Sequence, residues 1–359
     1  MAFAPTSDWL VAQPLASSTA LPAPYYVDPA AHELDRAAVL ARSWQLVAHE
    51  GAFAAAGDHV FDEIGGVPIL VVRGDDGVLR ALHNVCRHRA GPIAVTCGAG
   101  QRALRCRYHG WTYGLDGVLR CAPEMADARD FEPRAVRLPE ARVATWSGLV
   151  FVAIGEVPTL DAVLAGVSAR TAALGLPDFR HVRRVSYELA CNWKAYVDNY
   201  LEGYHLPHVH PVLNRMLDYR AYATELGDWH SLQSSPLEAA QGPYADGEAL
   251  YYFVYPNTML NLLPGRLQTN RVVPLAPQRC RVDFDYYYPG GARADALGER
   301  DVEFSDEVQR EDVAICEAVQ RGLASGSYFA GRLNPKRESG VHHFHELLRR
   351  AYREQPVAS

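Results

Sequence analysis

Two short clusters of cysteine and histidine constrain this chain more than any other feature of its sequence. The first is Cys86-Arg87-His88 and the second is Cys106-Arg107-Tyr108-His109, with 17 residues between them. Each cluster pairs one thiol with one imidazole. Side chains on two separate loops can share one metal centre only if a rigid scaffold holds the loops together, so we expect a small β domain that carries these clusters at its loop tips.

Two kinds of metal centre suit this ligand set. In a Rieske [2Fe–2S] cluster, two cysteines bind one iron and two histidines bind the other, which raises the reduction potential above that of an all-cysteine ferredoxin. A zinc ion also accepts two cysteines and two histidines. Zinc fingers usually pair like with like, whereas each segment here is mixed. The order Cys-x-His and then Cys-x-x-His therefore predicts a Rieske cluster held by Cys86, His88, Cys106 and His109.

Length and composition bound the remaining possibilities. The 359 residues are enough for two domains, and the net charge of −7 argues against nucleic acid as a partner. No run of 18 apolar residues is present, so we expect no membrane span, and residues 1–24 lack the features of a secretory signal. The other five of the seven cysteines are scattered without a framework spacing, which is typical of a protein of the reducing cytoplasm.

Strand and helix signals divide the chain into three parts. Residues 1–42 predict an extended arm and a helix that pack with the C-terminal part. Residues 43–156 contain short strands and tight turns, including a hairpin at Gly65-Gly66, and predict an all-β domain. Residues 157–359 combine tyrosine-rich strands with amphipathic helices, which predicts an α+β domain whose helices cover an antiparallel sheet.

A second metal site is indicated by the segment from Asp198 to Pro211, which crowds three histidines and two carboxylates into 14 residues. Two imidazoles and one carboxylate on iron(II) leave positions open for oxygen and substrate. We expect His205 and His210 to be the imidazole ligands. The spacing alone leaves His208 open, because His205 and His208 would be neighbours on a helix. Asn199, in the same segment, is a further catalytic candidate.

The carboxylate ligand has to come from another part of the chain. The predicted helix 301–322 carries Asp312 next to apolar residues, which favours an inward-facing side chain. Four other acidic residues of this helix are expected to be solvated: Glu303, Asp306, Glu307 and Glu311.

With these residues identified, the chain resembles the catalytic α subunits of the Rieske non-heme iron oxygenases over nearly its whole length. The family's catalytic pattern, Asp/Glu-x-x-His-x4-His, is matched by Glu202, His205 and His210, and its distal aspartate ligand maps onto Asp312. The resemblance implies one Rieske cluster and one mononuclear iron(II) per chain, O2 as co-substrate and a curved catalytic sheet of the helix-grip type. It also implies a homotrimer, in which Glu202 is not a ligand but links a metal-bound histidine to a Rieske histidine of the neighbouring subunit.

The glutamate at position 202 is a departure from the commoner aspartate. Together with Asn192-Trp193-Lys194 and the tail around His342-His343-Phe344-His345, it resembles the branch that acts on quaternary ammonium compounds, such as choline, carnitine, glycine betaine and stachydrine. The tail histidines are expected to be surface and packing residues. Aromatic faces bind such cations, and the C-terminal part is rich in tyrosine, although most of these rings are expected to fill the sheet core.

These features together predict a terminal oxygenase that hydroxylates a C–H bond next to nitrogen and so demethylates its substrate. No GxGxxG fingerprint is present, so electrons are expected from a separate NAD(P)H-dependent flavin/iron–sulfur reductase. Two rivals remain: ring hydroxylation of an aromatic compound, and a Rieske electron-transfer protein, which would need no second iron. An aromatic acid should be a poor substrate, because such a pocket is expected to lack a cation that could meet its carboxylate next to a ring-shaped slot.

Overall fold

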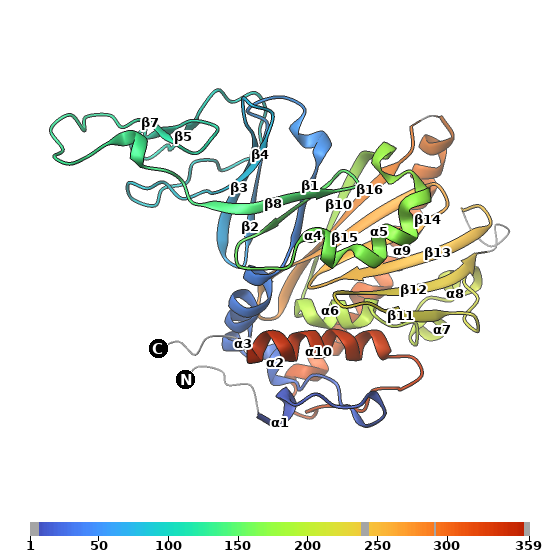
Figure 1. Cartoon of the computed structure of the whole chain (residues 1–359). Coiled ribbons are helices and arrows are strands. Elements are labelled where there is room, and N and C mark those ends of the chain that lie inside the picture. Colours follow the sequence, from blue (N-terminus) through green and yellow to red (C-terminus); the bar gives the residue numbers. More distant parts are fainter. Residues whose placement is uncertain (1–6, 238–243, 291, 355–359) are drawn as a thin grey trace. The chain divides into compact units, whose positions relative to one another are not determined.

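The structure is a computed structural model that describes residues 7–237, 244–290 and 292–354. It consists of two compact units, shown in Figure 1. The small unit is Leu40–Leu160, and the large unit is Met1–Val39 together with Asp161–Ser359. No helix in the described part of the chain is both long enough and apolar enough to cross a membrane.

The small unit is built from two antiparallel sheets. The six-stranded sheet has the order β1-β9-β8-β4-β3-β2. Its strands are β1 (Gln45–His49), β2 (His59–Ile64), β3 (Val67–Arg73), β4 (Leu79–His83), β8 (Glu140–Trp146) and β9 (Leu149–Ala153). The three-stranded sheet contains β5 (Leu104–Arg105), β6 (Thr112–Tyr113) and β7 (Leu119–Cys121). Three short 3-10 turns complete the unit: η3 (Leu40–Arg42), η4 (Glu50–Phe53) and η5 (Pro133–Ala135).

The predicted hairpin at Gly65-Gly66 is confirmed. It joins β2 to β3, and both glycines have positive φ angles of 55° and 84°. A two-residue turn of this hand matches the twist of the strands, and glycine adopts it without a steric cost.

The large unit contains a seven-stranded antiparallel sheet with the order β10-β16-β15-β14-β13-β12-β11. Its strands are β10 (Arg180–Leu189), β11 (Ala223–Leu226), β12 (His230–Leu237), β13 (Gly247–Val254), β14 (Thr258–Leu263), β15 (Arg266–Ala276) and β16 (Arg279–Tyr288). Side chains alternate between the two faces of a strand. The apolar residues Val272, Val282 and Phe284 share one face and contribute to the main hydrophobic core of the unit.

Helices cover this face of the sheet. The two that carry site residues are α6 (Trp193–Tyr200) and α9 (Ala292–Ala324), which pack against each other and against β16. The other helices and 3-10 turns that follow the small unit in the chain, of which α5 packs on the opposite face beside His230, are α4 (Leu160–Val163), α5 (Ala165–Thr171), η6 (Ala172–Leu174), η7 (Leu176–Asp178), α7 (Leu206–Val209), α8 (Pro211–Met216) and α10 (Ser339–Arg353). The predicted α+β class, an all-β unit plus an antiparallel sheet covered by helices, is therefore confirmed.

The N-terminal residues belong to the large unit. They form α1 (Ser7–Leu10), η1 (Leu15–Ser17), α2 (Pro24–Val27), α3 (Pro29–Leu34) and η2 (Asp35–Val39), and α1 packs beside α10. Asp35 is completely buried, where it forms an ion pair with Lys194 and accepts hydrogen bonds from Trp193 Nε1 and the Tyr352 hydroxyl. A buried charge is tolerated only when it is paired in this way, so Asp35 ties the N-terminal segment to α6 and α10.

Candidate metal centres and pocket

The first candidate centre lies at two loop tips of the small unit. One loop follows β4 and carries Cys86 and His88, and the other follows β5 and carries Cys106 and His109. The loops repeat the same backbone pattern: the amide of Cys86 donates to the carbonyl of Gly91 at 2.9 Å, and that of Cys106 donates to the carbonyl of Trp111 at 2.9 Å. The two cysteines therefore occupy equivalent positions on facing loops.

The four candidate ligands fall into a buried pair of cysteines and an exposed pair of histidines. Cys86 and Cys106 are 3% and 2% exposed, whereas His88 and His109 are exposed, with ring centroids 4.6 Å apart. Two buried thiols beside two solvent-edge imidazoles fit a mixed-ligand [2Fe–2S] cluster, with the imidazole-bound iron nearer to solvent.

Tyr113 is a residue of this centre that the sequence analysis missed. Its hydroxyl lies 3.3 Å from Cys86 Sγ and accepts a hydrogen bond from the amide of Arg87 at 3.0 Å. Burial and the hydrogen bond with Cys86 raise the pKa of Tyr113, so the phenol keeps its proton and has a donor for a metal-bound thiolate at Cys86. Hydrogen bonds to cysteine sulfur tune the potential of such a cluster.

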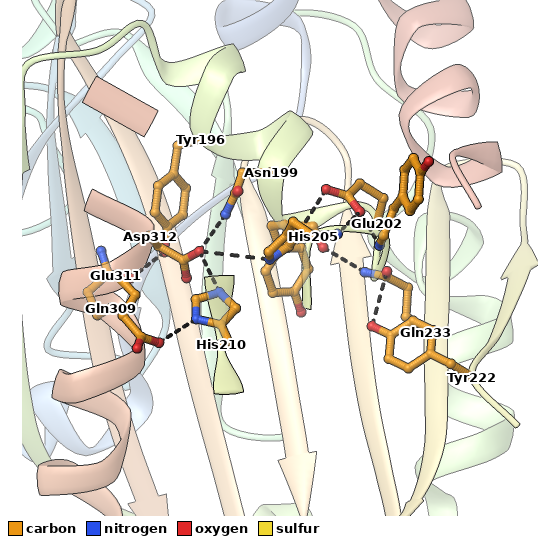
Figure 2. A network of polar contacts seen from close by, with 12 residues as sticks. Tyr196, Asn199, Glu202, His205, His210, Tyr222, Gln233, Gln309, Glu311 and Asp312 are labelled. Atoms are coloured by element: carbon orange, nitrogen blue, oxygen red, sulfur yellow. Dashed lines mark hydrogen bonds and ion pairs between the residues drawn. The ribbon is translucent and has the colours of Figure 1, made fainter. Parts of the chain in front are cut away.

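The second candidate centre brings His205, His210 and Asp312 together in the large unit. Their ligand atoms all lie within 4.8 Å of one another. Asp312 Oδ1 is 3.0 Å from His210 Nε2 and 4.0 Å from His205 Nε2 (Figure 2). His205 and His210 directly precede and follow the four-residue helix α7, and the chain leaves the helical conformation at His210, where φ is −118° and ψ is 73°. Both imidazoles thereby reach Asp312. His208, within that turn, is exposed.

Each of these imidazoles also has a carboxylate partner on its other nitrogen. His205 Nδ1 lies 2.6 Å from Glu202 Oε1, and His210 Nδ1 lies 2.7 Å from Glu311 Oε2. Both histidines therefore present Nε2 to Asp312, the arrangement in which second-layer carboxylates orient metal-binding imidazoles. Glu311 also comes from α9, directly before Asp312, and His210 lies between the two carboxylates.

The expectation that Glu311 is solvated is wrong, because its carboxylate is paired with the His210 imidazole. Asp306 is also more than a solvated charge, because it accepts a hydrogen bond from the Tyr187 hydroxyl at 3.0 Å. Glu303 and Glu307 are exposed, as expected.

Two further hydrogen bonds join α6 to α9 beside this centre, and one of them is to Asp312. Asn199 Nδ2, from α6, donates to Asp312 Oδ1 at 2.6 Å, and the Tyr196 hydroxyl donates to Gln309 Oε1 at 2.7 Å (Figure 2). Burial lowers the pKa of His210, but the hydrogen bonds and charges of Asp312 and Glu311 outweigh it, so the net pKa is raised. The same negative potential favours a divalent cation at this position.

A pocket of about 110 Å³ opens beside this centre. It is lined by the three candidate ligands and by side chains of α6, α9 and the sheet. Four of the tyrosines considered from the sequence line it, namely Tyr200, Tyr222, Tyr244 and Tyr251, and most of the other aromatic residues of the sheet are core residues. The expectation that the pocket lacks a cation is wrong, because Arg266 also lines it.

The tail histidines lie on α10 and in the described structure are absent from both the pocket lining and the metal-binding group. His345 is completely buried, and its Nε2 lies 2.9 Å from Asp198 Oδ1. His342 Nε2 lies 2.7 Å from the carbonyl of Gln13. These histidines therefore connect α10 to α6 and to the N-terminal segment.

Comparison with known proteins places this geometry in a family. Residues 43–140 match the Rieske [2Fe-2S] domain, and residues 176–354 match the ring hydroxylating alpha subunit (catalytic domain). The chloroplastic choline monooxygenase of Arabidopsis thaliana is 36% identical over 356 residues, which cover 93% of this chain and 83% of the relative. The carnitine monooxygenase oxygenase subunit of Escherichia coli (strain K12) is 31% identical over 352 residues, covering 93% of this chain and 94% of the relative.

The chain belongs to the Rieske oxygenases. As an α subunit of this family it is an oxidoreductase with a Rieske [2Fe–2S] cluster and a mononuclear iron, and O2 is its co-substrate. Its structure matches that of the quaternary ammonium Rieske monooxygenase CntA in complex with L-carnitine, with a TM-score of 0.84, 25% identity, and coverage of 95% of this chain and 99% of that chain. Naphthalene 1,2-dioxygenase from Rhodococcus sp., at 19% identity and a TM-score of 0.77, shares the fold.

Proposed function

We propose that this Rieske oxygenase hydroxylates a small quaternary ammonium compound at a C–H bond next to nitrogen. The observation that carries the proposal is the pocket beside His205, His210 and Asp312, whose walls include several tyrosine rings. The choline and carnitine monooxygenases among the relatives support the same substrate class.

The ligand assignments are part of the proposal. Cys86 and Cys106 would bind one iron of the Rieske cluster and His88 and His109 the other. His205, His210 and Asp312 would bind the mononuclear iron, which supplies the activation of O2 when it is bound. Two observations support these two sets. The thiols of the first set are buried while its imidazoles are exposed, and the ligand atoms of the second set lie within 4.8 Å of one another.

The protein's own groups would orient the second iron site. Glu202 and Glu311 hold the two imidazoles through Nδ1, and Asn199 holds the carboxylate of Asp312. These contacts leave Nε2 of both histidines directed to one point. Precise placement of this kind matters because a catalytic group that is displaced by about 1 Å can lose a hundredfold in rate.

The tyrosines would bind the cationic end of the substrate through their rings. The Tyr200 hydroxyl donates to Asn261 Oδ1 at 2.6 Å, and the Tyr222 hydroxyl donates to Gln233 Oε1 at 3.2 Å. Burial raises the pKa of both phenols well above the ordinary value, so the rings stay neutral. With their hydroxyls engaged, the rings offer faces to a trimethylammonium group, at about 0.5–2 kcal/mol for each good contact.

The overall reaction balances with two external electrons. Substrate, O2, two electrons and two protons give the hydroxylated product and water. A hydroxylated N-methyl group then collapses to formaldehyde, a tertiary amine and a proton. We propose that the electrons come from a separate NAD(P)H-dependent flavin/iron–sulfur reductase, since the sequence has no GxGxxG fingerprint of its own.

We further propose a homotrimer in which Glu202 links His205 of one subunit to the Rieske cluster of the next. The contact between Glu202 and His205 supports the first half of this path. A cytoplasmic location stays a prediction from the free cysteines, and the plant relatives are chloroplastic.

A substrate panel tests the proposed function. Purified protein with a reductase should couple oxygen uptake to release of formaldehyde or trimethylamine with choline- and betaine-type compounds, and not with benzoate or phthalate. The reverse result would assign the chain to ring hydroxylation. Metal analysis tests the other rival: three irons and two sulfides per chain are expected, whereas an electron-transfer protein would contain two and two.

A further inference from the structure

The lining of the pocket includes a buried arginine. Arg266, the first residue of β15, is 5% exposed and is the sole Lys or Arg among the described residues that line the pocket. Its Nη1 donates to the Tyr244 hydroxyl at 2.6 Å and to Asp301 Oδ1 at 2.8 Å. Asp301 is completely buried on α9, so the charge of Arg266 is held in place from both the sheet and the helix.

The hydrogen bonds of this arginine are incomplete. Its Nε is buried and finds no hydrogen-bond partner in the described structure. The same holds, within the described residues, for Nε2 of Gln268, two residues further along the same face of β15, and for Nε2 of Gln309 on α9. Both glutamines are 1% exposed. One acceptor on the same wall, Asn270 Oδ1, is also unpaired within the described residues. Because more than about 90% of buried polar groups are paired in folded proteins, three unpaired donors against one unpaired acceptor indicate a ligand rich in acceptor oxygens.

The chemistry of these donors favours a carboxylate. A guanidinium group is a planar set of donors that matches the two oxygens of a carboxylate, and hydrogen bonds between charged partners are stronger than neutral ones. An alcohol group brings one oxygen and no charge, so it would leave part of this set unsatisfied. The subsite therefore distinguishes an acid from an alcohol of the same length.

The pocket orients a substrate that has two different ends. Arg266 pairs with Asp301, about three turns of α9 before Asp312, so it lies away from the metal-binding residues. Iron(II) would offset the carboxylates of the metal end, so the orientation comes from the carboxylate of the substrate, which accepts from the unpaired donors of Arg266 and Gln268. A zwitterion thus binds with its nitrogen toward the metal-binding residues, where the C–H bonds next to nitrogen have to be.

The separation of the two ends indicates the length of the substrate. Asp301 and Asp312 both lie on α9, 11 residues apart, which corresponds to about 16 Å along the helix axis. Gln309 lies between them and lines the same pocket. A single methylene between nitrogen and carboxylate, as in (trimethylammonio)acetate, spans less of this distance than three methylenes do.

Resting on the function proposed above, we infer that the substrate is a trimethylammonium carboxylate with a spacer longer than one carbon, and that Arg266, with Gln268, binds its carboxylate. This goes beyond the quaternary ammonium class, because it excludes choline-like alcohols as the preferred substrates. Arg266 becomes the residue that sets specificity.

Calorimetric binding to the oxidised holoprotein tests the inference without turnover. The probes are 4-(trimethylammonio)butanoate and the matching alcohol, (4-hydroxybutyl)trimethylammonium. The native protein should bind the acid at least tenfold more tightly than the alcohol, and more tightly than (trimethylammonio)acetate. Arg266→Lys keeps a charge beside Asp301 but has no planar set of donors, so it should weaken binding of the acid about 10- to 100-fold and leave the alcohol within twofold.

Arg184→Lys is the matched control, because Arg184 forms a two-point ion pair with Asp285 on the same sheet without lining the pocket. It should leave both affinities unchanged. Gln268→Leu leaves the Arg266–Asp301 ion pair intact and should lower the affinity for the acid without changing the affinity for the alcohol. This second variant keeps the inference testable if Arg266→Lys does not fold.

Each outcome decides between the two proposals. Equal binding of acid and alcohol by the native protein, or equal loss of both in Arg266→Lys, overturns the carboxylate subsite. If the alcohol is bound and oxidised while the acid is not, the proposed function stands and the inference fails. If neither probe binds, the inference fails, and the substrate panel described above decides the proposed function.

Discussion

Glu311 allows the mononuclear metal site to be perturbed without removing one of its candidate ligands. Its Oε2 accepts a hydrogen bond from His210 Nδ1 at 2.7 Å, and this bond determines which ring nitrogen faces Asp312. In Glu311→Gln the side chain keeps its size but loses its charge. An amide can also turn its NH2 group toward Nδ1, which would favour the wrong tautomer of His210.

The expected loss can be bounded from the structure. Removing a carboxylate partner of a metal-binding histidine typically lowers metal affinity 10- to 100-fold, or about 1.4–2.8 kcal/mol. The Glu311 side chain is 31% exposed, so solvent screens part of its charge, and we expect a value near the lower limit. Glu311→Gln should therefore bind iron(II) about tenfold more weakly than the native protein.

Competition with a chelator measures this affinity. The Rieske absorbance serves as an internal reference, because its candidate ligands belong to the other unit. Glu307→Gln is the control, since Glu307 is exposed one turn earlier on α9. Iron affinity of Glu311→Gln within twofold of the native protein and of the control would refute the reasoning. Parallel loss of iron and Rieske absorbance would show unfolding instead of a local effect.

Four further tests, with five substitutions, address other parts of the structure. His205→Ala should remove the mononuclear iron and keep the Rieske absorbance, whereas His208→Ala, at an exposed position, should keep both; metal analysis of the two variants decides. His109→Cys should lower the reduction potential of the cluster, because a thiolate donates more charge than an imidazole, and an unchanged potential in voltammetry would contradict the ligand assignment. Glu202→Gln should keep a reducible cluster but slow its reoxidation by substrate and O2 in stopped-flow measurements; a native rate would exclude the proposed electron path. Burial lowers the pKa of His343 to about 4, so the free energy of unfolding should fall as the pH drops from about 6.5 to 4, where the unfolded chain binds the extra proton; thermal unfolding should show a flatter pH profile in His343→Gln.

Local patterns were sufficient for several features of this protein. The hairpin at Gly65-Gly66 and the cap of α6, where Asn192 Oδ1 accepts from the amide of Lys194 at 2.9 Å, depend on residues that are neighbours in the chain. The same is true of His205 and His210, since the short helix α7 sets their relative direction.

The remaining features depend on contacts between distant segments. Glu311 lies 101 residues from His210 and Asn199 lies 113 residues from Asp312, and these pairs meet because α9 packs against α6 and the sheet. Amphipathicity indicates the buried side of α9, but Glu311 and Asp312 are adjacent, and only packing shows that both reach His210 from that helix.

The sequence by itself was sufficient for the family and for the two sets of candidate ligands, because these depend on spacing within short segments and on a pattern shared by relatives. Tertiary structure decided the composition of the pocket. Arg266, Tyr244 and Asp301 come from three different segments, and all three are buried in the structure. Their polar atoms converge only when the sheet and α9 enclose a volume from which water is excluded, and no local pattern in the chain encodes that meeting.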